Sequence, residues 1–131
     1  GTVTGADGNT YEVTSITKGA VAGESSITTV VVGDGITAIG KGAFKNCDSL
    51  TKVAIGDDVT SILKDAFRGD SNLTRVYINS AALEKIGSYA FGGISKSAVI
   101  KVTGTKSQYS RTYDLIEKSH INASVKVKRH A

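Results

Sequence analysis

Residues 50–67 read Leu-Thr-Lys-Val-Ala-Ile-Gly-Asp-Asp-Val-Thr-Ser-Ile-Leu-Lys-Asp-Ala-Phe, and this stretch carries the apolar pattern that decides the fold. Val53 and Ile55 alternate with other residues, which is typical of a short strand with one buried face. Residues 56–58 (Gly-Asp-Asp) predict a turn, because glycine and aspartate tolerate turn conformations. The Ala-Phe pair at residues 66–67 suits one turn of α- or 3₁₀-helix.

The same pattern recurs at intervals of 23 or 24 residues, since Ala-Phe also stands at residues 43–44 and 90–91. The alternating strand pairs with this step are Val30/Val32, Val53/Ile55, Val76/Ile78 and Ile100/Val102. Aliphatic residues precede each phenylalanine by five and by eight positions, namely Ile39, Ile62, Ile86 and Ile36, Val59, Leu83. Several independent positions in one register predict an internal structural repeat.

A unit this short cannot bury its apolar face alone, so neighbouring units must stack into a solenoid with a continuous core. We expect about four coils, whose strands form a parallel sheet with a spacing of about 4.8 Å. Phe44, Phe67 and Phe91 should form an internal ladder. Val13, Ile16 and Val21 fit the register one repeat earlier. The predicted array therefore covers residues 1–104, with a partial first repeat from about residue 11 in which Val21 tapers the ladder.

The units resemble the leucine-rich repeats of the BspA-type bacterial cell-surface proteins. Residues 46–50 (Asn-Cys-Asp-Ser-Leu) match the opening of that repeat, and Ile39-Gly40 and Ile86-Gly87 match its Ile-Gly step. The consensus proline is replaced by Gly33 and Gly56, and the Asn-Cys pair by Gly69-Asp70 and Gly93-Ile94. The resemblance covers roughly residues 11–102. It implies a leucine-rich repeat solenoid of the short α/β right-handed superhelix type, with an extracellular or bacterial cell-surface location and a role in adhesion.

After Val102 the period stops, and residues 105–131 are expected to form a C-terminal cap of the same domain. Thr105-x-x-Gln108 has the form of a capping box that opens a helix. Tyr109, Tyr113, Ile116 and His120 recur at helical spacing, which predicts a partly buried His120, and Asn122 can end the helix. Val125-x-Val127 alternates like a last strand, and His130 falls in a tail. Such a cap protects the open end of a repeat array.

The composition argues against an enzyme. The 131 residues include one cysteine, Cys47, and two histidines near the C-terminus, which leaves little material for a nucleophile–base pair. The turns at residues 7–9 and 33–35 lack the acidic spacing of a calcium loop, so we expect no metal and no cofactor. The repeat position of Cys47 predicts an inward-facing, inert thiol. No segment reaches the ~20 apolar residues of a membrane span, and no leader precedes the repeats, so a secretion signal is absent or removed.

Charge is distributed unevenly. Residues 1–100 hold nine basic and ten acidic side chains, a net −1, whereas residues 101–131 hold seven basic and two acidic ones, a net +5. We interpret the basic end as a polar, solubilising cap, because neither an arginine cluster nor basic–aromatic interleaving indicates nucleic acid.

The predicted functional feature is the exposed face of the sheet. Residues between the buried strand positions must point outward. The candidate binding residues on that face are Val31, Lys52, Ala54, Arg75, Tyr77, Asn79 and Lys101. Tyr77 between Arg75 and Asn79 has the amphipathic make-up of a recognition hot spot.

The leading hypothesis is a non-catalytic adhesion module that binds a host or matrix protein or a glycan through this face, without nucleic acid and without membrane insertion. The alternative is a structural spacer or a fragment of a larger surface protein that has no ligand of its own.

Overall fold

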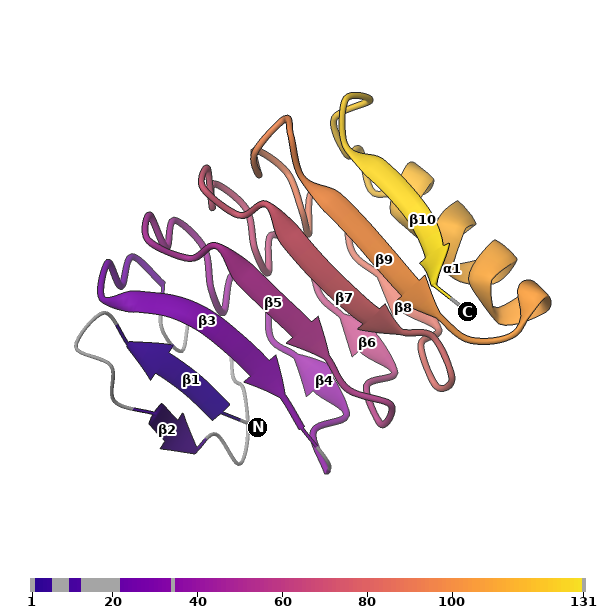
Figure 1. Ribbon diagram of the computed structural model, residues 1–131, viewed down its shortest axis with the longest axis horizontal. Coiled ribbons are helices and arrows are strands. Elements are labelled where there is room, and N and C mark those ends of the chain that lie inside the picture. The colour runs from indigo at the N-terminus through magenta and orange to yellow at the C-terminus, as the bar shows by residue number, and fades with distance from the viewer. Residues whose placement is uncertain (1, 6–9, 13–21, 34, 131) are drawn as a thin grey trace.

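The computed structural model describes residues 2–5, 10–12, 22–33 and 35–130. Its main feature is a large curved sheet, most of whose strands run parallel (Figure 1). The strands of that sheet are β3 (Ile27–Val32), β5 (Lys52–Ile55), β7 (Arg75–Asn79), β9 (Val99–Thr103) and β10 (Lys126–His130). Val53 pairs with Val30 on one side and with Val76 on the other. Consecutive coils therefore stack in the register that the repeat predicts, and the predicted solenoid of stacked coils is confirmed.

A second, smaller parallel sheet lies behind the first (Figure 1). It consists of β4 (Ala38–Ile39), β6 (Ser61–Ile62) and β8 (Lys85–Ile86). Apolar side chains from both sheets belong to one core. The predicted strand pairs and the aliphatic positions that precede each phenylalanine are all buried in it.

The phenylalanine ladder is confirmed. Phe44 stacks on Phe67, and Phe67 on Phe91, with ring centroids 5.3 Å apart and ring planes within 4° of parallel in both pairs. All three rings are at most 1% exposed. Val21, the predicted taper of this ladder, lies outside the described residues, as do Val13 and Ile16.

The Ala-Phe segments form successive hydrogen-bonded turns, so the predicted turn of α- or 3₁₀-helix is wrong. The Ala43 N–H donates to the Gly40 carbonyl of its own coil, at 3.1 Å. The Phe44 N–H instead donates to the Ala66 carbonyl of the next coil, at 2.8 Å. Because alternate N–H groups donate to the next coil, the segment cannot form the continuous series of hydrogen bonds that a helix requires. The coils are therefore hydrogen-bonded to one another on this side as well as in the sheets.

The C-terminal cap consists of α1 (Lys106–Lys118) followed by β10. The capping box is confirmed: the Thr105 hydroxyl accepts from the Gln108 N–H at 3.2 Å, and Gln108 Oε1 accepts from the Thr105 N–H at 2.9 Å. On α1, Thr112 and Ile116 are buried. Tyr113, which shares the helical spacing of Ile116, is instead 40% exposed.

The predicted end of the helix is also wrong, because α1 stops four residues before Asn122. Ser119 caps the helix with its N–H and hydroxyl on the Ile116 carbonyl, and His120 follows with a left-handed φ of 62°. A left-handed residue directly after a helix is a common way to terminate it. His130 is likewise not in a tail, since it is the last residue of β10 and pairs with Thr103.

An N-terminal hairpin that the repeat pattern does not predict completes the large sheet. β1 (Thr2–Gly5) pairs antiparallel with β3, and β2 (Thr10–Glu12) pairs antiparallel with β1. The parallel array therefore ends at β3, and the hairpin covers the edge that β3 would otherwise expose.

Candidate functional site

The outer surface of the large sheet is assembled by strand alternation and register. Buried aliphatics alternate with other residues at Val30/Val32, Val53/Ile55, Val76/Ile78 and Ile100/Val102, so the side chains between them point to the other side. We call this surface, formed by β3, β5, β7, β9 and β10, the sheet face. Two rows run across it, listed in strand order: Thr29, Lys52, Arg75, Val99, Lys126 and Val31, Ala54, Tyr77, Lys101, Lys128.

Tyr77 occupies the middle of the second row, between two cations. The Lys52 ammonium nitrogen lies 5.5 Å from the centroid of its ring, and the Lys101 nitrogen lies 5.9 Å from it. These distances fall within the range of a cation–π interaction. The ring is half-buried among its neighbours, which holds it as a fixed platform on the sheet.

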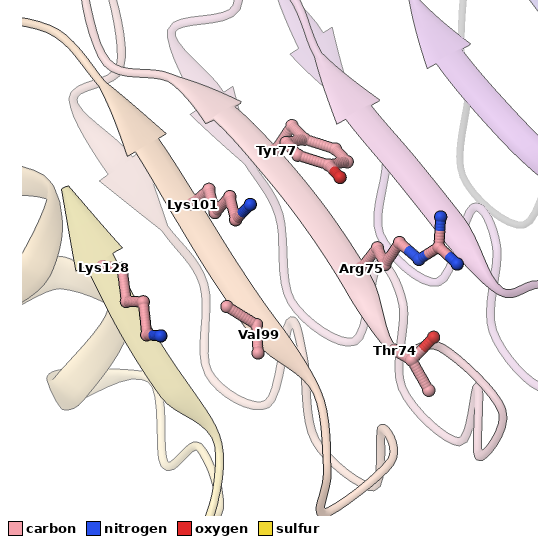
Figure 2. Close-up of a pocket in the computed structure, with 6 residues that line it drawn as sticks. All are labelled: Thr74, Arg75, Tyr77, Val99, Lys101 and Lys128. Atoms are coloured by element: carbon pink, nitrogen blue, oxygen red, sulfur yellow. The ribbon is translucent and has the colours of Figure 1, made fainter. Parts of the chain in front are cut away.

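A depression of about 550 Å³ opens on the sheet face beside Tyr77. It is lined by Thr74, Arg75, Tyr77, Val99, Lys101 and Lys128. Figure 2 shows the Lys101 side chain extending from β9 toward Tyr77, and Lys128 extending from β10 toward Val99. Residues from β7, β9 and the cap strand therefore form a single hollow.

The charged groups of the sheet face are all of one sign. The five strands contain no aspartate or glutamate, whereas the two rows include the basic residues Lys52, Arg75, Lys101, Lys126 and Lys128. Lys52 pairs directly with Arg75, and Lys101 with Lys128. Like charges opposite one another on neighbouring strands are destabilising. An anionic group placed between them removes that repulsion.

The structure brings together only part of the predicted site. Lys52, Arg75, Tyr77 and Lys101 lie around the central ring, whereas Val31 and Ala54 lie toward the N-terminal end of the same row. Asn79 lies at the end of β7, where its side-chain oxygen accepts from the Ala81 N–H at 3.0 Å.

Sequence reasoning missed Thr74, Val99 and the two cap lysines, Lys126 and Lys128. The alternation of Val125 and Val127 was the available signal, because inward valines at those positions turn the lysines outward. Three of the seven basic residues of the C-terminal end, Lys101, Lys126 and Lys128, thus belong to the sheet face.

Cys47 is buried as predicted. Its side chain is 0% exposed, and burial, reinforced by the nearby Asp70, raises the thiol pKa to about 12. A thiol in this state is a poor nucleophile.

Asp70 is a buried carboxyl that the sequence analysis did not single out. It occupies the repeat position of Cys47 one coil later and is 0% exposed. The Cys47 N–H donates to its Oδ1 at 2.7 Å, and its Oδ2 has no hydrogen-bond partner. Loss of solvation raises the Asp70 pKa to about 8, against the effect of this hydrogen bond. Because no solvent reaches it, this carboxyl is part of the packing between coils and not a site for a substrate.

The predicted burial of His120 is wrong, because the residue is exposed. Its ring stacks on Tyr89 with centroids 4.9 Å apart, and the Arg68 guanidinium lies 4.9 Å from the Tyr89 centroid on the same surface. Within the described part of the chain, no three histidine, cysteine or acidic side chains gather as metal ligands. Nor does any described helix have the length and apolar character of a membrane span.

The repeat architecture agrees with a comparison against known protein families. Residues 9–122 match the family model described as a BspA type leucine rich repeat region with 6 copies. The chain belongs to the BspA-type leucine-rich repeat family. The family resemblance stated from residues 46–50 and from the Ile-Gly steps is thereby confirmed. BspA-type repeats are generally non-enzymatic, and they are typical of bacterial surface and secreted proteins. Searches of curated proteins and of solved structures give no significant match.

Proposed function

We propose that this chain is a non-catalytic repeat module of a bacterial surface or secreted protein, and that it binds an adhesion partner through the sheet face. The observation that carries the proposal is the arrangement around Tyr77, an aromatic platform flanked by Lys52 and Lys101 on a face without acidic residues. Aromatic and arginine side chains on a rigid, preformed surface are the usual anchors of recognition.

Two groups that chemistry could otherwise use are inaccessible to a substrate in the described part of the chain. The thiol of Cys47 and the carboxyl of Asp70 are both buried. The repeats supply stacking contacts and a rigid frame, which is what a binding face on a solenoid requires.

The test is a double variant, Tyr77→Ala with Arg75→Ala, assayed against immobilised matrix proteins and a glycan array. A matched control removes an aromatic and a basic residue outside the sheet face, Tyr113→Ala with Lys118→Ala, both at exposed positions of α1. We expect binding to be lost in the first variant and retained in the second, with unchanged circular dichroism in both.

If the first variant bound every ligand of the parent unchanged, the sheet face would not be the binding surface. Absence of any ligand in either panel would contradict the proposal and favour the structural spacer.

A further inference from the structure

We infer that the partner of the sheet face is a linear acidic polysaccharide that lies across β5, β7, β9 and β10. This inference rests on the proposed function, because it names the chemical class of the ligand for the same face. Ligands of this class are chains of sugar rings that carry sulfate or carboxylate groups.

The spacing of the cations follows the strands. Neighbouring strands lie about 4.8 Å apart, and basic residues stand on four adjacent ones: Lys52, Arg75, Lys101, and the pair Lys126 and Lys128. They form a band perpendicular to the strands, two rows wide. A band of one sign focuses the field on its own surface and attracts a polyanion along its length.

The cap strand enlarges this band. β10 pairs in parallel with β9, which sets Lys128 beside Lys101 and Lys126 beside Val99. The intervening Arg129 points the other way and donates to the Gly104 carbonyl from two of its nitrogens, at 3.2 and 3.3 Å. β10 therefore contributes two cations to the sheet face, and its third, Arg129, holds the strand to the Gly104 carbonyl.

Tyr77 gives the band a place for a sugar ring. The apolar C–H faces of pyranose rings pack on aromatic side chains, and the phenol hydroxyl adds a hydrogen-bonding group. Lys52 and Lys101 lie over the ring, 5.5 and 5.9 Å from its centroid, so a sugar that packs on Tyr77 displaces an ammonium group from the ring. The displaced lysine, on its long flexible side chain, then pairs with an anionic group of that sugar.

The composition of the face favours a polysaccharide over a protein or a nucleic acid. The cores of protein interfaces are depleted in lysine and depend on buried apolar anchors. On this face Val31 is the only large hydrophobic residue of the described rows that is more than a third exposed. Single-stranded nucleic acids stack on successive aromatic side chains, whereas the two rows contain the single aromatic residue Tyr77.

The experiment measures binding of the full chain to immobilised heparin, which is sulfated, and to polygalacturonate, which is carboxylated. Neutral dextran, duplex DNA and inorganic polyphosphate serve as comparison surfaces. We expect affinity for at least one acidic polysaccharide that falls steeply with salt, and no binding to dextran. The heparin and polygalacturonate arms distinguish the two anionic groups.

Three variants locate the contact. Lys101→Ala with Lys128→Ala should weaken polysaccharide binding on the order of tenfold, because it removes two adjacent charges from the band. Lys41→Ala with Lys118→Ala removes the same charge from exposed positions elsewhere, and it should change the affinity less than about twofold. Tyr77→Ala should weaken binding to the polysaccharide and leave binding to polyphosphate, which has no sugar ring, unchanged.

Three results would overturn the inference: no binding to either polysaccharide, equal losses in the two lysine variants, or tighter binding to DNA than to both polysaccharides. If a matrix protein still bound the parent and not the Tyr77→Ala/Arg75→Ala variant, the proposed function would stand without this ligand.

Discussion

The buried carboxyl of Asp70 makes the stability of this fold depend on pH in an unusual direction. Exposed carboxylates that gain partners on folding stabilise a protein as pH rises. Asp70 is instead 0% exposed with one unpartnered oxygen, and its pKa rises from 3.8 to about 8. The folded protein therefore keeps a proton that the unfolded chain has already released.

The size of the effect follows from that difference. Between about pH 4 and pH 8 the unfolded state binds fewer protons at Asp70 than the folded state, so the free energy of unfolding falls as pH rises. Each pKa unit corresponds to about 1.4 kcal/mol, which makes the full shift worth roughly 6 kcal/mol. Small domains have about 5–15 kcal/mol of stability in total. We therefore expect a loss of several kcal/mol across this window.

The assay is urea unfolding followed by circular dichroism at pH 4.5, 6, 7.5 and 8.5, in the presence of a reductant for Cys47. The matched variant is Asp70→Asn, which keeps an oxygen to accept from the Cys47 N–H and cannot ionise. We expect the midpoint of the parent to fall steadily with pH and that of the variant to stay nearly flat. A parent midpoint that is constant or rises over this range, or a variant with the same slope, would refute the reasoning.

Three further predictions concern the packing of the coils. Phe67→Ala should lower the free energy of unfolding by about 3–5 kcal/mol in urea titrations, and more than Phe91→Ala, because Phe67 stacks on two rings of the ladder and Phe91 on one. Gly87→Ala should cost more than about 1 kcal/mol by the same assay, because a β-carbon there would lie 2.4 Å from the Lys64 backbone nitrogen; a neutral result would contradict the close approach of these coils. Cys47 should react with a thiol reagent only as fast as the protein unfolds, and rapid labelling of the native protein would show that its thiol is accessible.

The solenoid and its core were predictable from the sequence because a repeat constrains many positions at once. The period that places Phe44, Phe67 and Phe91 in one column also fixes which strand positions point inward. One misread position does not change this register. The parallel sheet follows, because identical units can bury their apolar edges only by stacking.

The segments outside the repeat were less predictable, since single turns are decided by individual hydrogen bonds. Helical spacing from Tyr109 to His120 indicated a longer helix than the one observed, and Ser119 ends it early by bonding back to Ile116. The repeat spacing of 23 or 24 residues does not indicate the antiparallel hairpin of β1 and β2. The turns at Ala-Phe depend on bonds between coils, which the sequence of one coil does not contain.

The candidate site was half predictable. Strand alternation gave the outward direction of Lys52, Arg75, Tyr77 and Lys101. The pairing of β10 with β9 was not predictable, because the sequence of a strand does not show which strand it pairs with or in which direction. The sequence analysis did not single out Asp70, and only the structure shows that it is buried and that one of its oxygens lacks a donor.

The most direct test of the account is a map of the ligand-contacting surface in solution. Amide resonances of the isotope-labelled protein would be followed during titration with a size-defined acidic oligosaccharide. We expect the largest shifts in β7, β9 and β10, centred on Tyr77, Lys101 and Lys128. Shifts concentrated instead on α1, or on the turns around Tyr89 and His120, would contradict the claim that the sheet face is the binding surface.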